Sequence, residues 1–200
     1  MSCQPEVWIR PARDGDAAAM ACLHQEGIGE GFLSTLGHSF LARLYRRVVR
    51  SPGGFGFVAG SNTEVEGFIA GTEAVGRLYR EFLVRDGVMA VLGSLPELLR
   101  GWRRARETLS YGRKESGRHD LPAAELLAVA VSPALQGRGV GRRLVEEFVA
   151  ELGCRGVNSA KVVVGADNGP ALALYKKCGF RAAARRELHR GTASEVLVWP

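Results

Sequence analysis

The sequence of 200 residues contains no apolar run approaching the roughly 18 to 20 residues that a helix needs to cross a bilayer. Its first residues lack the basic segment followed by an apolar segment that marks a signal peptide. Four scattered cysteines, Cys3, Cys22, Cys154 and Cys178, form no C-x-x-C pair, so neither a zinc site nor a disulfide framework is indicated. We therefore expect a soluble, cytoplasmic protein with no metal and no stable membrane insertion.

Aromatic residues are also few, at 8% of the chain, while hydrophobic residues make up 46%, which is typical of a globular protein. The formal net charge is +6, and residues 77–118 hold ten Lys/Arg and five Asp/Glu. A basic run such as R-G-W-R-R-A-R usually forms a solvated helix face, and no signature of a nucleic-acid-binding fold accompanies it. Nucleic acid is therefore not expected as a partner. Binding through 77–118 remains an alternative, which a steep salt dependence would reveal.

Apolar periodicity and turn residues predict one domain over residues 1–200 in which strands and helices are mixed. The predicted strands are 7–10, 55–59, 65–72, 126–131, 160–165, 180–184 and 195–199. The predicted helices are 17–25, 39–50, 142–152 and 169–178. Residues 74–120 are expected to form a helical insertion, with helices at about 77–84, 89–92 and 95–109 and a polar tail over 110–120.

The most informative stretch of the chain is 124–152. Its apolar segment 126–131 predicts a strand buried on both faces. The glycines that follow, Gly137, Gly139 and Gly141, would let backbone N–H groups close around an anion. The next helix adds unpaired N–H groups and the positive end of its dipole. The expected ligand is a phosphate or pyrophosphate, although a plain turn between a strand and a helix would use glycine in the same way.

Two motifs lie in this region, in a fixed order. The first is Q-G-R-G-V-G, in which Gln136, Gly139 and Gly141 match the pattern Gln/Arg-x-x-Gly-x-Gly/Ala. The second, over 166–180, is A-D-N-G-P-A-L-A-L-Y-K-K-C-G-F. Together they resemble the GNAT superfamily of N-acetyltransferases. The resemblance implies the GNAT fold, an α/β (α+β) domain whose central, mixed but mostly antiparallel, twisted sheet is flanked by helices, here with the insertion at about 74–120.

The resemblance also implies acetyl-CoA as co-substrate. In this family the strand before the glycine loop splays from the next strand, and the pantetheine arm lies in the gap while the loop holds the pyrophosphate. An asparagine at the start of the second motif's helix binds the pantetheine arm, although Asn168 could equally cap that helix. The implied cofactor-binding residues are Val129, Ala130, Val131, Gln136, Gly137, Arg138, Gly139, Val140, Gly141, Arg142, Asn168 and Tyr175.

Acetyl transfer to an amine needs a base, a donor for the developing oxyanion and an acid for the leaving thiolate. The resemblance implies Tyr175 as the acid, because an ordinary tyrosine pKa of about 10 keeps it protonated at neutral pH. Glu125 matches the base glutamate of histone-type members, with a solvated strand end and a water relay as alternatives. Members that acetylate ribosomal-protein N-termini carry their glutamate on the next strand, where this chain has Val163. Nothing near Cys178 supports a nucleophilic thiol, so direct transfer is expected.

The acceptor is the least defined part of the expected reaction. The segment between the first two helices lines the acceptor pocket in this family, which implies Phe32, Ser34 and Thr35 as substrate contacts, with simple packing as the alternative. The implied function is an N-acetyltransferase that moves the acetyl group of acetyl-CoA directly to a primary amine of an amino sugar, a small amine or amino acid, or a protein N-terminus. A homodimer is common in the family. The alternative is a non-catalytic acyl-CoA-binding sensor or interaction module.

Overall fold

The computed structural model describes residues 6–28, 37–86, 121–189 and 192–200. Within the insertion at about 74–120, the predicted first helix is described. The helices predicted at about 89–92 and 95–109 and the polar tail 110–120 lie outside the described residues.

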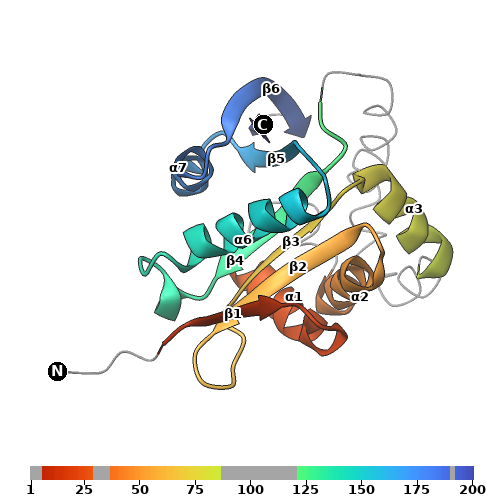
Figure 1. Ribbon diagram of the computed structural model, residues 1–200, viewed down its shortest axis with the longest axis vertical. Coiled ribbons are helices and arrows are strands. Elements are labelled where there is room, and N and C mark those ends of the chain that lie inside the picture. The colour runs from red at the N-terminus through yellow and green to blue at the C-terminus, as the bar shows by residue number, and fades with distance from the viewer. Residues whose placement is uncertain (1–5, 29–36, 87–120, 190–191) are drawn as a thin grey trace.

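The described residues form a single twisted sheet of seven strands, in the order β1-β2-β3-β4-β5-β7-β6 (Figure 1). The strands are β1 (Trp8–Pro11), β2 (Gly54–Gly60), β3 (Gly67–Thr72), β4 (Glu125–Val131), β5 (Ala160–Gly165), β6 (Arg181–His189) and β7 (Thr192–Trp199). The helices are α1 (Ala17–Gly27), α2 (Gly37–Arg50), α3 (Val75–Arg85), α6 (Val140–Cys154) and α7 (Gly169–Lys177). Neighbouring strands are antiparallel except β4 and β5, which are parallel. The mixed, mostly antiparallel sheet expected from the sequence is confirmed.

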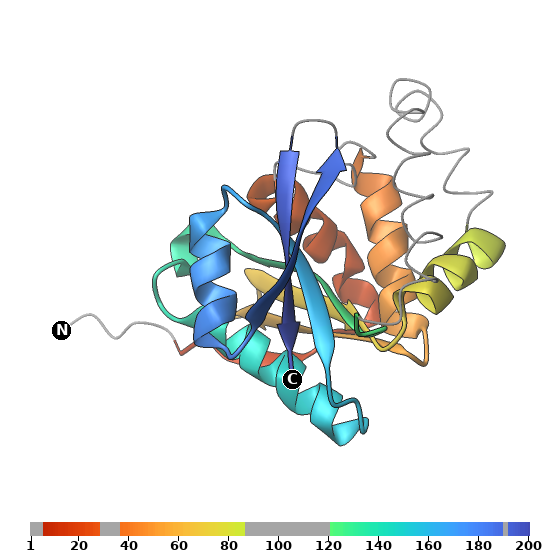
Figure 2. The same cartoon turned by 90° about the horizontal axis from the view of Figure 1, so that it is seen from above.

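The sheet is the middle of three layers. Helices α1 and α2 cover one face and α6 covers the other (Figure 2). Successive side chains of β2 and β3 point to opposite faces of the sheet, so both strands contribute side chains to the core on each face. Ile69 packs in the core under α6, and Phe68 packs in the core under α1 and α2. The helix predicted at 142–152 is part of α6, and its apolar face packs on the sheet, with Leu144 and Phe148 fully buried.

A glycine lets α6 lie close to the sheet next to the start of β4. A Cβ placed on Gly71 would lie 2.2 Å from Cε2 of Phe148 and 2.9 Å from the carbonyl oxygen of Glu125. The Phe148 ring occupies this space and stacks on Phe55, with 5.1 Å between ring centroids. The absence of a side chain at Gly71 therefore sets the distance between α6 and the strands that carry the site.

The prediction about β4 is met in part. The apolar run 126–131 predicts burial on both faces, and both faces pack against a core, but the degree of burial alternates along the strand. Leu126, Ala128 and Ala130 are buried, while Leu127 and Val129 are only partly so. Val129 and Val131 pack on the α6 side of the sheet and Ala128 and Ala130 on the α1 and α2 side, so a core covers each face of β4.

Candidate active site

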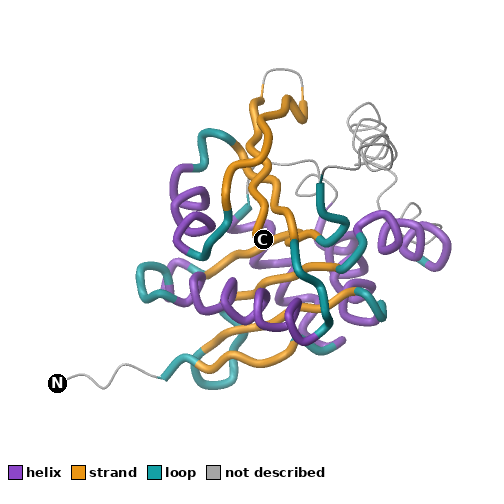
Figure 3. Tube along the Cα trace, turned by 45° about the horizontal axis from the view of Figure 1, so that its top comes forward, coloured by secondary structure: helices purple, strands orange, loops and turns teal. Residues whose placement is uncertain are grey.

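The strands β4 and β5 diverge soon after they meet. Of the seven residues of β4 and the six of β5, all of them described, only Glu125 and Leu126 of β4 pair across to β5, opposite Lys161 and Val162. Beyond this junction the two groups of strands run in clearly different directions (Figure 3). The sheet therefore opens into a seam, defined here as the unpaired stretch between Leu127–Val131 of β4 and Val163–Gly165 of β5. The splay expected from the resemblance is present.

A β-bulge lies at the closed end of the seam. Opposite β3, Ala70 faces Ala128 and Gly71 faces Leu126, so Leu127 is an extra residue without a partner on β3. Because the bulge breaks the alternation, Leu127 and Ala128 both pack on the α1 and α2 side of the sheet. This shift turns the start of β4 toward the space beside α2.

The glycine loop at the other end of the seam has the backbone shape that anion binding requires. Gly137 and Gly139 have φ values of +73° and +77°, and a Cβ at either would meet nothing within 4 Å. In the helix that follows the loop, the N–H of Arg143 donates a hydrogen bond to the carbonyl oxygen of Gly139 at 3.1 Å. The N–H groups of Gly141 and Arg142 precede it in the first turn of α6, where N–H groups have no intrahelical acceptor. The loop and helix terminus can therefore hold a phosphate group.

Some side chains of the loop hold it in place, and others are exposed and charged. Gln136 donates from Nε2 to the carbonyl oxygen of Val131 at 3.0 Å, which ties the loop to the end of β4. Val140 is buried, so only its backbone can face a ligand. Arg138 and Arg142 are exposed, and Arg142 lies 2.7 Å from Glu146 one turn along the helix. The charges near the expected pyrophosphate are therefore those of Arg138 and Arg142.

The second motif forms α7 as predicted. Asn168 Oδ1 accepts a hydrogen bond from the N–H of Ala171 at 3.1 Å, so Asn168 caps the helix. Gly179, at φ +89°, ends it. Tyr175 on this helix is buried against Phe180, with ring centroids 5.6 Å apart, and burial raises its pKa. The raised pKa keeps the Tyr175 hydroxyl protonated at neutral pH, so it can act as a proton donor.

The Cys178 thiol lies one turn beyond Tyr175. Burial raises the pKa of this thiol, which disfavours the thiolate that nucleophilic catalysis would need. The structure therefore supports packing as the role of Cys178.

Glu125 is more than a solvated strand end. Its side chain is 17% exposed, and Oε2 lies 3.7 Å from Nζ of Lys161, whose side chain is 4% exposed. The two residues face each other in the short β4–β5 ladder, at the closed end of the seam. Lys161 could not be identified from the sequence, because a single lysine at the start of a strand carries no signal until the strand register is known.

Ser132 is a second residue that the sequence analysis did not single out. Its Oγ is buried and has no hydrogen-bond partner within the described part of the chain, although buried hydroxyls are nearly always paired. Ser132 follows β4 directly and begins the turn into the glycine loop, where Gln136 donates its N–H to the Ser132 carbonyl oxygen at 3.1 Å. An orphaned hydroxyl between the seam and the loop fits a site that a polar ligand completes.

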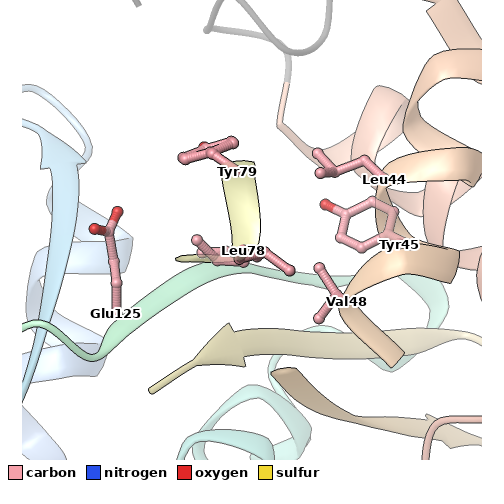
Figure 4. Close-up of a pocket in the computed structure, with 7 residues that line it drawn as sticks. Leu44, Tyr45, Val48, Leu78, Tyr79 and Glu125 are labelled. Carbon is pink, nitrogen blue, oxygen red and sulfur yellow. The ribbon is translucent and has the colours of Figure 1, made fainter. Parts of the chain in front are cut away.

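A pocket of about 140 Å³ lies beside Glu125 (Figure 4). Residues of α2, α3 and β4 line it: Leu44, Tyr45, Val48, Leu78, Tyr79, Glu125 and Leu127. The bulge places Leu127 in this wall. The acceptor contacts expected at Phe32, Ser34 and Thr35 lie outside the described residues.

Behind the pocket, Tyr45 forms a buried pair with a histidine. The Tyr45 hydroxyl lies 2.5 Å from Nδ1 of His24 on α1, and both residues are buried. Burial lowers the pKa of His24 to about 4, so the imidazole is neutral at pH 7. Burial also raises the pKa of Tyr45. The pair joins α1 to α2 and fixes the ring that forms one wall of the pocket.

We expect His24 to make the fold sensitive to mild acid. Its folded pKa of about 4 is lower than the ordinary 6.5, so between these values the unfolded chain binds a proton that the native state excludes. Stability is therefore complete above pH 6.5 and falls as the pH drops toward 4, by roughly 3 kcal/mol in total. Urea unfolding at a series of pH values measures the effect.

The control is the difference between the wild type and His24→Gln, because Gln is neutral throughout and can still bond Tyr45. The variant should lose most of the slope between pH 6.5 and 4. His38→Gln, at an exposed position on α2, should follow the wild type. Parallel curves for the wild type and His24→Gln would contradict the prediction.

Two further findings concern the described residues. Within these ranges no group of three or more His, Cys, Asp or Glu side chains could hold a metal ion. In the same part of the chain no helix has the length and apolar character that a bilayer crossing demands.

The sequence of this chain is similar to those of known acetyltransferases. Ribosomal protein bS18-alanine N-acetyltransferase of Salmonella typhimurium is 42% identical over 73 residues, which cover 36% of this chain and 49% of that protein. Mycothiol acetyltransferase of Catenulispora acidiphila is 38% identical over 79 residues, which cover 40% of this chain and 23% of that protein. The matches thus span about half or less of the length of these relatives.

A solved structure from Salmonella typhimurium, described as yncA, a putative acetyltransferase with its cofactor acetyl-CoA, has the same fold. Its TM-score is 0.59 at 19% sequence identity, with 96% of this chain and 92% of that chain covered. The sequence profile described as the acetyltransferase (GNAT) family matches residues 26–180, most of the chain. By sequence and fold together, the chain belongs to the acetyltransferase (GNAT) family.

Proposed function

We propose that this protein is an N-acetyltransferase that moves the acetyl group of acetyl-CoA directly to a primary amine. The observation that carries the proposal is the seam between β4 and β5. It has an anion-binding loop at one end and the partly buried carboxylate of Glu125 at the other. Acetyl-CoA, when bound, supplies the acetyl group as a thioester. The unpaired edge of β4 over 129–131 would lie along its pantetheine arm, and Gln136 to Arg142 would hold its pyrophosphate.

In the proposed reaction, residues of the chain accept a proton from the amine and donate a proton to the leaving sulfur. Glu125 accepts one from the amine, which makes the nitrogen a nucleophile. A backbone N–H near Ala130 and Val131 donates to the oxygen on which negative charge develops. Tyr175 Oη donates its proton to the departing sulfur. A nitrogen–carbon bond forms and a carbon–sulfur bond breaks. The ammonium form of the acceptor gives its first proton to Glu125, and its second proton, lost after the nitrogen–carbon bond has formed, replaces the one that Tyr175 gives to the sulfur.

The similar proteins support an amine acceptor without specifying one. By name, one relative is an alanine N-acetyltransferase of ribosomal protein bS18 and another is a mycothiol acetyltransferase. This chain has Val163 on β5, where the ribosomal-protein type is expected to carry its glutamate, so we assign the base to Glu125. A single domain over residues 1–200 and a cytoplasmic location are parts of this proposal. The described cysteines, Cys22, Cys154 and Cys178, are free, as is usual in a reducing compartment.

The first experiment combines acetyl-CoA calorimetry with a thiol-release assay on a panel of amines, amino sugars and peptides. We expect acetyl-CoA to bind and at least one acceptor to release free CoA thiol. Absence of acetyl-CoA binding at high micromolar concentration would overturn the proposal. Tight binding with no release across the panel would favour a non-catalytic acyl-CoA sensor.

A further inference from the structure

The pocket beside Glu125 has one wall that comes from the insertion at about 74–120. Helix α3, which lies between β3 and β4 in the chain, contributes Leu78 and Tyr79 to the lining. Figure 4 shows Glu125 on one side of the pocket and Tyr45 with the other α2 residues on the opposite side, with Leu78 and Tyr79 between them. The space is therefore shaped by α3 as much as by β4.

Polar contacts hold α3 in place against its neighbours. Arg47 of α2 bonds Asp86, which follows α3, at 2.6 Å, and the Ser51 hydroxyl donates to Glu81 at 2.7 Å. The start of the helix is tied to the strand side as well, because Val75 donates its N–H to the carbonyl oxygen of Ala123 at 3.2 Å. These contacts give the wall formed by α3 a defined position before any ligand arrives.

The lining combines apolar side chains with a smaller share of polar surface. Four of the seven side chains are aliphatic, two are tyrosines, and Glu125 brings the one charged group among them. The Tyr45 hydroxyl already bonds His24. Such a wall favours an apolar group and disfavours a hydroxyl-rich one, which would lose its hydrogen bonds to water.

The volume sets the size of that group. The pocket measures about 140 Å³. A protein cavity of about 150 Å³ with an apolar lining holds a molecule of the size of benzene. One ring or one branched aliphatic chain fits, whereas a sugar ring with its hydroxyl groups does not match the lining.

We propose that this pocket is the acceptor's side-chain subsite, so that the acceptor is a primary amine carrying one compact apolar group. The group packs between α2 and α3, and the amine faces Glu125 at the bulge of β4. This inference rests on the proposed acetyl transfer and narrows its substrate class, with Tyr79 as the residue of α3 that determines specificity.

The test compares kcat/KM for 2-phenylethylamine and 3-methylbutylamine with those for ethanolamine and glucosamine. The apolar amines should be preferred by tenfold or more. Tyr79→Ala should reduce that preference at least fivefold by removing one wall, while Tyr79→Phe should retain it. Arg80→Ala, at the exposed neighbouring position on α3, is the matched control and should leave the preference unchanged. Because Tyr79 is only partly buried, these variants should fold.

Calorimetry of 2-phenylethylamine and ethanolamine on the complex with CoA gives a readout that does not require turnover. Preferential binding of 2-phenylethylamine, weakened by Tyr79→Ala, supports the inference. Turnover or binding that favours the polar amines, or a preference that Tyr79→Ala does not change, overturns it and leaves acetyl transfer intact. Absence of acetyl-CoA binding, measured separately, would instead overturn the proposed function.

Discussion

Replacement of Tyr175 by phenylalanine should lower kcat by about 100-fold to 1,000-fold and leave the acetyl-CoA dissociation constant nearly unchanged. The ring that packs on Phe180 is kept, so the fold and the cofactor seam should persist. Burial of Tyr175 raises its pKa, so the hydroxyl that the variant lacks is protonated at neutral pH, as a proton donor to the leaving thiolate must be. Steady-state thiol release and acetyl-CoA calorimetry on the same preparation measure the two effects.

The matched control for this variant is Cys178→Ala, close by at the end of the same helix. Direct transfer needs no thiol from the protein, so Cys178→Ala should retain most of the wild-type kcat. A kcat for Tyr175→Phe within a fewfold of wild type would remove Tyr175 from the mechanism. Loss of turnover in Cys178→Ala, with the fold intact, would instead point to a covalent route.

Glu125→Gln should show two losses at once. Turnover should fall by a factor of about 100 or more, because the amide cannot take the amine's proton. The free energy of unfolding should also fall, by about 3 kcal/mol, because the buried ammonium of Lys161 loses the carboxylate that lies 3.7 Å away. Thiol release and urea unfolding measure the two losses separately.

The double variant Glu125→Gln/Lys161→Met separates the two roles. Methionine has a similar length and no charge, so it removes the ammonium that Glu125→Gln leaves without its carboxylate. We expect unfolding stability to recover toward wild type while turnover stays low. Recovery of turnover in the double variant would show that Glu125 matters only as the partner of Lys161 and is not the base.

Much of the fold could be predicted because its strongest local signals agree with one another. The strand 160–165 and the helix that begins at Gly169 are bounded by glycine, proline and an asparagine cap, and the structure places them as expected. The periodicity of 142–152 identified the face of α6 that is buried. Both glycine-rich motifs also carry their geometry locally, since φ values at Gly137 and Gly139 are properties of single residues.

Features that depend on strand register could not be predicted. The bulge at Leu127 and the pairing of Glu125 with Lys161 arise from how separate strands align, and an apolar run gives no information about alignment. The contact of Arg143 is of the same kind, because its guanidinium donates to the carbonyl oxygen of Val7, far away in the sequence, at 3.1 Å. The direction of the Arg143 side chain depends on how α6 is rotated against the sheet, which is known only from the packed structure.

The short ladder between β4 and β5 has a consequence for the solubility of the protein. Most sheets keep unpaired edges at their two sides, but this one has a further pair of edges in its middle. Backbone groups on such edges must find partners, and an unprotected edge is a template on which another chain can add as a strand. A pantetheine arm lying along β4 would take the place of that strand. Loading with cofactor would thus protect the protein against aggregation, as an edge-covering element does in other sheets.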